Sequence, residues 1–203
     1  DANWDFGTNP CSEIILRPYQ FCNLTEVVVR STDNIDDLER KVRVATILGT
    51  IQSTYTKFPY LRKVWKRNTE EERLLGVSLT GIMDNKLLTR RNKGLDKTLE
   101  HLREIAVNSN AMWADRLDIP QSTAITCVKP SGTVSQLVDS ASGIHPRYSR
   151  YYIRTVRGDN KDPLTTFMKD QGIPSEPDIM KPDVTTVFIK DTGVVTNQVL
   201  LSM

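Results

Sequence analysis

Residues 24–55 read LTEVVVRSTDNIDDLERKVRVATILGTIQSTY and contain two contrasting patterns. The first seven residues are rich in β-branched side chains, which is typical of a strand. The next four are Ser, Thr, Asp and Asn, which favour turns and the first turn of a helix. From Ile35 to about Tyr55, apolar residues recur every three or four positions, which predicts an amphipathic helix.

The same alternation continues along the rest of the chain. We expect strands over 74–82, 123–128, 151–157 and 184–190, and helices over 95–117, from 133 onward and over 162–171. Pro120 ends the long helix, because proline cannot continue the hydrogen-bond ladder. Strands that alternate with helices predict an α/β fold with largely parallel strand pairing.

The composition excludes several classes of protein. The 203 residues include 27 Lys and Arg against 25 Asp and Glu, and a net charge of +2 gives no field that would attract nucleic acid or an anionic membrane. A content of 38% hydrophobic and 26% charged residues excludes a disordered chain. No apolar run reaches the length of a membrane span, and no signal peptide is present at the start. We therefore expect a soluble, cytoplasmic protein without membrane or direct nucleic-acid binding.

Cysteine content and the chain ends add two expectations. Three cysteines, an odd number without regular spacing, do not form the disulfide framework of a secreted domain. The first residue is not Met and the last ten residues are largely apolar, whereas natural termini are usually polar. We expect residues 1–203 to be one partial domain that is truncated at both ends.

The motif Asn9-Pro10-Cys11-Ser12-Glu13 brings three reactive types of side chain together. Pro10 favours an extended backbone at Asn9, so Asn9, Cys11 and Glu13 are expected to project to one side. A carboxylate can act as a general base, an amide can hold a hydroxyl group, and sulfur can act as a nucleophile or carry a hydrogen atom. No metal site is implied, because one Cys has no His or second Cys at ligand spacing. The alternative is an ordinary turn with a small buried Cys.

A second motif, KPSGTVS at 129–135, has the features of an anion site. A strand, a glycine-containing turn and a helix start would expose backbone N–H groups beside Ser and Thr hydroxyls. The phosphate-binding loop of nucleotide hydrolases is absent, so hydrolysis is not implied. The alternative is a loop without a ligand.

Four ordered motifs carry a resemblance to a known family: TNPCSEI at 8–14, CNLTEV at 22–27, KPSGTVS at 129–135, and SGIHP at 142–146 followed by YSRYY at 148–152. Together they resemble the catalytic chain of ribonucleotide reductases. The likeness is strongest to the adenosylcobalamin-dependent, class II enzymes of the ribonucleoside-triphosphate reductase type, and it extends from about residue 4 to about residue 190.

The resemblance implies a fold and a radical mechanism. The chain would supply the finger loop and the second half of a ten-stranded α/β barrel. Cys11 matches the cysteine that, as a thiyl radical, removes the 3′ hydrogen of the nucleotide. Glu13 matches the carboxylate that takes the 3′-hydroxyl proton, and Asn9 matches the amide that binds the ribose hydroxyls.

The resemblance also implies partners and a cofactor. Cys22 matches one of two cysteines that reduce the 2′ carbon; the other lies upstream in the family, and an external thioredoxin-like dithiol re-reduces the pair. Adenosylcobalamin would generate the radical in an intact enzyme that includes the remainder of the reductase chain. The substrate would be a ribonucleoside tri- or diphosphate whose phosphates contact Ser131, Gly132, Thr133 and Ser135. The isolated chain is expected to be inactive.

Alternatives remain at this point. In a class I large subunit the radical would arrive from a metal-bearing second subunit, and the adjacent Tyr151 and Tyr152 are compatible with a radical relay, although the short spacing of Cys11 and Cys22 favours class II. A non-catalytic nucleotide-binding module would keep the loops. A thiol-dependent transferase is less favoured, because no His lies near Cys11 in the sequence. Cys127 is interpreted as a strand-interior residue and His145 as structural.

Overall fold

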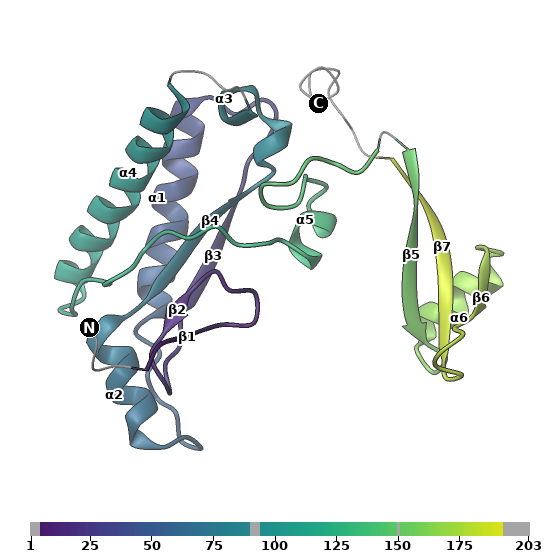
Figure 1. Cartoon of the computed structure of the whole chain (residues 1–203), viewed down its shortest axis with the longest axis horizontal. Helices are drawn as coiled ribbons and strands as arrows, with labels where there is room; N and C mark the ends of the chain where they lie inside the picture. The colour runs from purple at the N-terminus through teal and green to yellow at the C-terminus, as the bar shows by residue number, and fades with distance from the viewer. Residues whose placement is uncertain (1–4, 90–93, 150, 193–203) are drawn as a thin grey trace. The chain divides into compact units, whose positions relative to one another are not determined.

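The computed structural model describes residues 5–89, 94–149 and 151–192 (Figure 1). These residues fall into two units that separate between Pro146 and Arg147. The first unit contains β1 (Gly7–Thr8), β2 (Ile15–Leu16), β3 (Asn23–Val28), α1 (Ile35–Gln52), α2 (Lys63–Glu72), β4 (Leu75–Thr80), the short helix η1 (Ile82–Asp84), α3 (Lys86–Thr89), α4 (Leu95–Arg116) and α5 (Thr133–Leu137). The second contains β5 (Tyr151–Asp159), α6 (Pro163–Asp170), β6 (Ser175–Pro177) and β7 (Val184–Thr192).

Two parallel strands, β3 and β4, form the centre of the first unit. Leu24 lies opposite Gly76 and Val27 lies opposite Leu79, so the side chains of both strands alternate between the same two faces. Helices α1 and α4 pack along one side of the pair, whereas the β1–β2 hairpin lies on the other (Figure 1). The hydrophobic core therefore lies between the strands and the helices, and its buried members are Val27, Val29, Leu38, Val42, Ala45, Val77, Leu88, Leu102 and Ala106.

Helix α1 begins where the sequence predicts. The Asn34 side chain accepts a hydrogen bond from the Asp37 amide at 2.9 Å, and the Asp37 carboxylate accepts one from the Asn34 amide at 3.3 Å. This reciprocal capping satisfies two backbone donors that the helix itself leaves free. The helix ends at Gln52, three residues before the predicted end.

The predicted strand over 123–128 follows the free edge of β4 without forming a regular strand. Hydrogen bonds join the segment to β4. The Cys127 amide donates to Val77 O at 3.0 Å, and the Val77 amide donates to Ile125 O at 2.8 Å. Only one β-bridge results, between Val77 and Thr126. The segment therefore adds a third, irregular backbone segment beside the β3–β4 pair.

The expectation of largely parallel pairing is wrong for much of the chain. Among the described residues, β3 and β4 pair in parallel, but β1–β2 and the sheet in the order β5–β7–β6 are antiparallel. The described residues form a mixed α/β fold with small sheets, and they do not close a barrel. The sequence pattern also does not indicate α2, which is polar along most of its length.

The second unit is a three-stranded antiparallel sheet with α6 on one side. Asp162 caps α6 by accepting a hydrogen bond from the Leu164 amide at 2.9 Å. Gly158 in β5 lies against Thr165 of this helix, since a Cβ at position 158 would lie 2.2 Å from the Thr165 hydroxyl oxygen. An ion pair between Arg157 and Asp178 at 2.7 Å joins β5 to the loop before β7.

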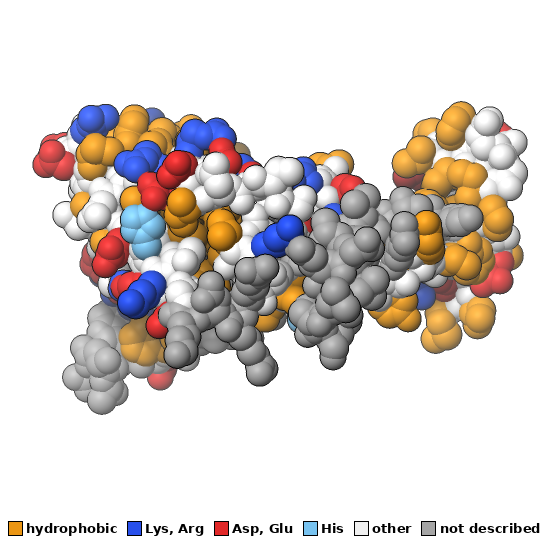
Figure 2. Space-filling view, turned by 90° about the horizontal axis from the view of Figure 1, so that it is seen from above, with side chains coloured by type: hydrophobic (Ala, Val, Ile, Leu, Met, Phe, Trp, Pro, Cys, Tyr) orange, Lys and Arg blue, Asp and Glu red, His pale blue; other side chains and the backbone are white. Residues whose placement is uncertain are grey.

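Two observations concern the outside of the molecule. In the part of the chain that the structure describes, each helix is too short or too polar to cross a membrane. On the face seen in Figure 2, Lys and Arg side chains lie beside Asp and Glu side chains rather than in a separate basic patch.

Gly76 provides a test of how the sheet and its surroundings pack. A Cβ at this position would lie 2.4 Å from Cδ2 of Leu24, 3.1 Å from Sγ of Cys127 and 3.2 Å from Cδ1 of Ile14. We expect Gly76→Ala to lower the free energy of unfolding by roughly 1–3 kcal/mol, because overpacking forces these neighbours apart. Gly7→Ala is the control, since a Cβ there meets nothing within 4 Å. Urea denaturation measures both, and equal midpoints for the two variants would contradict the packing described.

Candidate active site

The β1–β2 hairpin presents the motif of residues 9–13 at its tip. Asn9 closes the turn through its backbone, which donates to Ile14 O at 3.2 Å, and through its side-chain oxygen, which accepts from the Ile14 amide at 3.1 Å. Ser12 donates to Asn9 O at 2.9 Å and has a φ of 61°. The predicted extended arrangement of 9–13 is therefore wrong, because the Asn9 side chain stabilises a turn. The turn leaves Cys11 exposed and Glu13 half-buried.

The base of the hairpin is anchored on α2. The buried Arg17 side chain forms ion pairs with Glu71 at 3.1 Å and with Glu72 at 3.3 Å. Asn68 donates to Pro18 O at 2.9 Å. The ring of Phe21 stacks on that of Trp65, with 4.6 Å between centroids. These contacts fix residues 17–21, and through them they fix the direction in which the hairpin projects.

The hairpin tip covers the face of the β3–β4 pair that the helices leave open. Ile14 and Cys127 both reach the space above Gly76, which has no side chain of its own. Glu13 lies near enough to Cys22 and Cys127 for its charge to act on both thiols. One face thus brings together residues of the hairpin, of the start of β3 and of the 123–128 segment that lies beside β4.

Both covered thiols are held in the protonated form. Burial raises the pKa of Cys22 to about 12, with further contributions from Cys127 and Glu13. Burial also raises the pKa of Cys127 to about 11, and the Glu13 charge adds to this effect while Lys129 opposes it. Neither thiol is a thiolate near neutral pH, so both can donate a hydrogen atom but are poor nucleophiles. All three cysteines are free.

Two carboxylate oxygens at this face have no hydrogen-bond partner. Glu13 Oε2 and Glu26 Oε1 are buried, and no donor among the described residues reaches them. Glu26 forms an ion pair with Lys129, with 3.7 Å between Oε2 and Nζ. A buried acceptor without a donor is costly, so these oxygens are suited to a ligand that brings hydroxyl groups.

The turn at 129–135 uses two of its predicted ligand residues internally. Ser131 Oγ accepts from the Ser135 amide at 3.1 Å, and Ser135 Oγ donates to Ser131 O at 3.1 Å and to Gly132 O at 3.0 Å. Both serines are buried, at 4% and 0% exposure. Gly132 and Thr133 are exposed, so the backbone and the Thr133 hydroxyl are the parts open to an anion.

Residues 138–145 are fastened to the ends of β3 and β4. Thr80 Oγ1 accepts from the Gly143 amide at 2.8 Å and donates to Ala141 O at 3.2 Å. Gly143 has a φ of +54°, and a Cβ there would lie 3.0 Å from Lys129 O, so glycine lets this loop pass beside the 129–135 turn. His145 is exposed.

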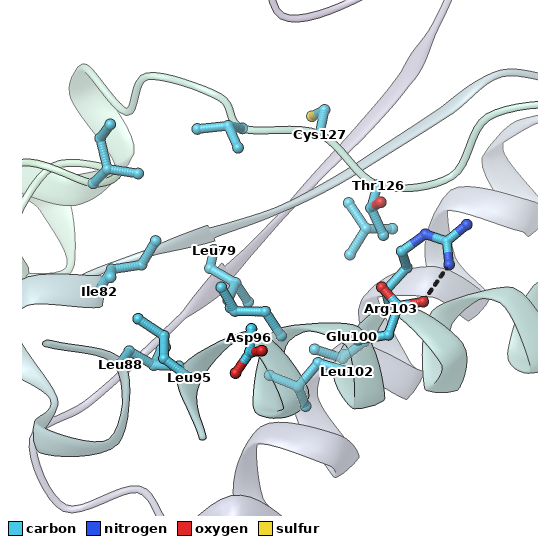
Figure 3. A pocket seen from close by; sticks show the side chains of 15 residues that line it. Leu79, Ile82, Leu88, Leu95, Asp96, Glu100, Leu102, Arg103, Thr126 and Cys127 are labelled. Atoms are coloured by element: carbon cyan, nitrogen blue, oxygen red, sulfur yellow. Dashed lines mark hydrogen bonds and ion pairs between the residues drawn. The ribbon is translucent and has the colours of Figure 1, made fainter. Parts of the chain in front are cut away.

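An apolar cavity of about 530 Å³ lies on the opposite, helical side of β4. Figure 3 shows leucine and isoleucine side chains from β4, η1, α3 and α4 around it, with the Glu100–Arg103 ion pair at one side. Cys127 lines its upper edge. None of Asn9, Cys11, Glu13 and Cys22 lines this cavity, and Cys127 is the residue that it shares with the candidate site.

The structure thus brings together some predicted residues and adds others. Glu13 and Cys22 meet at one face, with Asn9 shaping the turn beside them. Sequence reasoning missed Glu26 and treated Cys127 as a strand-interior residue. The available signal was the alternation along 22–28, which places position 26 on the same face as position 24.

Comparisons with known proteins find relatives in both sequence and structure. An adenosylcobalamin-dependent ribonucleoside-triphosphate reductase of Lactobacillus gasseri is 31% identical over 205 residues, covering 87% of this chain and 27% of the relative. The enzyme of the same name from Euglena gracilis is 31% identical over 185 residues, covering 89% and 24%. A crystal structure of a B12-dependent, class II ribonucleotide reductase superposes with a TM-score of 0.76 at 26% identity, covering 96% of this chain and 30% of that one.

The resemblance to class II ribonucleotide reductases is confirmed. The chain spans about a quarter of the length of the curated reductases that it matches. No protein-family profile matches it. The structural match therefore extends over nearly all of this chain but under a third of that enzyme.

Arg17 is expected to hold the β1–β2 hairpin in place. Arg17→Gln should lower the free energy of unfolding by about 1.5–3 kcal/mol, because it removes charge-assisted bonds of a buried side chain. It should also speed amide hydrogen exchange over residues 14–20. Arg67→Gln is the control: Arg67 pairs with the same Glu71, at 4.0 Å but on the surface, and its loss should cost less than about 1 kcal/mol. Equal effects of the two variants would show that Arg17 does not anchor the hairpin.

The three thiols are expected to react with iodoacetamide in a fixed order. At about pH 8, Cys11 should be labelled first because it is exposed, while Cys22 and Cys127 should react slowly because their thiolate fractions are small. Raising the pH should accelerate Cys127 before Cys22, since the pKa of Cys127 is about 11 and that of Cys22 about 12. Peptide mapping by mass spectrometry measures the order. Labelling of Cys22 ahead of Cys11 in the folded chain would contradict the structure.

Proposed function

We propose that this chain forms part of the active site of an adenosylcobalamin-dependent enzyme that reduces ribonucleoside triphosphates to 2′-deoxyribonucleoside triphosphates. The observation that carries the proposal is an exposed thiol, Cys11, in the same hairpin turn as the half-buried Glu13, whose charge acts on the protonated Cys22 thiol. Relatives named for this activity match the chain over most of its length.

Cys11 and Glu13 would act on the 3′ position of the ribose. A thiyl radical on Cys11 removes the 3′ hydrogen atom and becomes a thiol again. Glu13 accepts the 3′-hydroxyl proton, for which its unpartnered oxygen is suited. Asn9 is bound within the turn through its side-chain oxygen, which leaves its NH₂ group as the donor toward a sugar hydroxyl.

Cys22 would supply reducing equivalents at the 2′ carbon. The 2′ hydroxyl leaves as water, a hydrogen takes its place, and two thiols are oxidised to one disulfide. Cys22 is one of these thiols, and its raised pKa keeps the transferable hydrogen on sulfur. The second thiol would come from another segment of a reductase-length chain. At the end of the cycle, Cys11 takes back the 3′ hydrogen from the product.

Turnover then needs an external dithiol. A thioredoxin-like protein would re-reduce the disulfide by thiol exchange. The cytoplasm keeps thiols reduced, so we place the enzyme there. Because the second cysteine and the external reductant act outside these 203 residues, the chain by itself would not turn over.

The exposed tip fits contact with the cofactor. Adenosylcobalamin, when bound, supplies the organic radical that takes the hydrogen atom from a thiol. Cys11 fits this contact because its thiol is exposed, whereas Cys22 and Cys127 are partly covered.

The nucleotide phosphates would bind near the 129–135 turn. Gly132 and Thr133 present an exposed backbone and a hydroxyl, while Ser131 and Ser135 maintain the shape of the turn from inside. The phosphates of the nucleotide would then lie at the 129–135 turn and its ribose at the hairpin. Holding the sugar between fixed groups supplies the orientation that a radical transfer requires.

Cys11→Ser in a reductase-length polypeptide that carries this sequence tests the proposal. With adenosylcobalamin and a dithiol, we expect deoxynucleotide formation to fall by about 10³-fold or more, since the atom-transferring group is lost. Glu13→Gln should lower it by about 10²-fold, the scale of a general base. Ser12→Ala is the matched control and should retain activity, because Ser12 is exposed at the same tip.

Two outcomes would contradict the proposal. Retained reduction in Cys11→Ser would remove the radical role from this thiol. Product that forms only with a metal-bearing second subunit, and not with adenosylcobalamin, would assign the chain to class I instead.

A further inference from the structure

Lys129 is the first residue of the 129–135 turn, and its side chain reaches Glu26 on β3. Its ammonium group is 3.7 Å from Glu26 Oε2 and donates to Pro130 O at 3.3 Å. The side chains of Lys129 and Glu26 are 23% and 11% exposed, so both are largely removed from solvent. The pair joins the middle of β3 to the residue that begins the KPSGTVS motif.

Lys129 and Glu26 have hydrogen-bonding capacity that their contact with each other does not use. The separation of 3.7 Å is longer than a hydrogen bond, so the contact with Glu26 is an ion pair without a short N–H···O bond. An ammonium group has three donors, and Pro130 takes one of them. Glu26 Oε1 is buried without a donor. Lys129 therefore has donors left for a further acceptor at this face.

The positive charge of Lys129 determines whether an anion can bind at this face, because two carboxylates lie nearby. Glu13 and Glu26 contribute two negative charges. Lys129 contributes a positive charge, which pairs with Glu26 and lowers the pKa of Cys127. Without Lys129, the two carboxylates would repel a phosphate group. With it, one positive charge lies within the turn itself, 3.3 Å from Pro130 O, and Pro130 is two residues before the exposed Gly132.

The backbone at Lys129 is also fixed. Gly143 passes so close that a Cβ there would lie 3.0 Å from Lys129 O, and Gly143 is itself held by the Thr80 hydroxyl at 2.8 Å. Pro130 restricts the conformation of Lys129 toward an extended backbone. The ammonium group is thus carried by a backbone with little freedom, which favours a defined binding contact.

We propose that Lys129 determines the affinity of this site for the phosphates of the nucleotide, and that Glu26 moderates this affinity as its counter-ion. The inference rests on the proposed function, in which phosphates bind at the 129–135 turn. Lys129 keeps its contact with Glu26 and uses its remaining donors on phosphate oxygen. The Glu26 carboxylate offsets part of the positive charge, so its removal leaves more of that charge for the ligand.

Binding of inorganic triphosphate to the full 203-residue chain tests the proposal without any reductase assay. Lys129→Gln should weaken binding roughly tenfold or more, because a charge-assisted contact is lost. Lys129→Arg keeps the charge and should bind within about threefold of the unsubstituted chain. Glu26→Gln should bind several-fold more tightly, an effect that misfolding cannot imitate. NMR titration measures all of these constants.

The surface pair on α2 provides matched controls. Lys66 and Glu70 are 3.8 Å apart, close to the separation of Lys129 and Glu26, but both lie on the exposed side of a helix. Lys66→Gln and Glu70→Gln should each leave triphosphate affinity unchanged. These variants account for the general effect of one charge on the binding of an anion.

The outcomes separate this proposal from the proposed function. Unchanged affinity in Lys129→Gln, weaker binding in Glu26→Gln, or no saturable binding by the unsubstituted chain would each overturn it. None of these results bears on Cys11, whose substitution is read out by deoxynucleotide formation. Conversely, Cys11→Ser should bind triphosphate as the unsubstituted chain does, even if reduction fails.

Discussion

The parallel pairing of β3 with β4 is the constraint on which the rest of the first unit depends. Because side chains alternate along both strands, the register that sets Leu24 opposite Gly76 sends Val27 and Val77 toward the helices and Glu26 toward the hairpin. A slip of one residue would exchange the two faces. One face is then packed with hydrocarbon by α1 and α4, and the other is left for polar and reactive groups.

The hairpin completes the site because its position is fixed from two directions. Arg17 and Phe21 hold its base on α2, and Ile14 packs at its tip over Gly76. The absence of a side chain at Gly76 is what lets the hairpin and the 123–128 segment approach the same point. The three thiols acquire different properties from this packing: Cys11 stays exposed, whereas burial keeps Cys22 and Cys127 protonated.

Elements that are specified by local patterns could be predicted from the sequence. The apolar spacing and the Asn34 cap located α1, and the same spacing located α4. Helix α2 could not be located in this way, because Asn68 and Thr69 are buried against residues far away in the chain. The extended form expected for 9–13 failed because the Asn9 side chain closes a turn, an effect that Pro10 does not reveal. Largely parallel pairing was expected from the alternation of strands and helices, and it failed for β1–β2 and for the β5–β7–β6 sheet because that alternation carries no direct information on strand direction.

Some residues of the candidate site could likewise be predicted from the sequence, whereas others could not. Asn9, Cys11 and Glu13 could be selected from their spacing, whereas Cys22 was selected from the resemblance to reductases. In the structure the charge of Glu13 acts on Cys22. The pairing of Glu26 with Lys129 could not be read from the sequence, because it depends on how β3 and the 123–128 segment flank β4. The internal use of Ser131 and Ser135 was likewise hidden, since a Pro-Ser-Gly-Thr turn has the same sequence whether its hydroxyls face inward or outward.

Hydrogen removal from the 3′ carbon by Cys11 is the central claim, and isotopic substitution at that carbon tests it most directly. A reductase-length polypeptide that carries this sequence would be given a mixture of ordinary and 3′-deuterated ribonucleoside triphosphate with adenosylcobalamin and a dithiol. We expect the deuterated nucleotide to be reduced more slowly in competition, and we expect Cys11→Ser to reduce neither. Equal consumption of both nucleotides, with product still formed by Cys11→Ser, would contradict it.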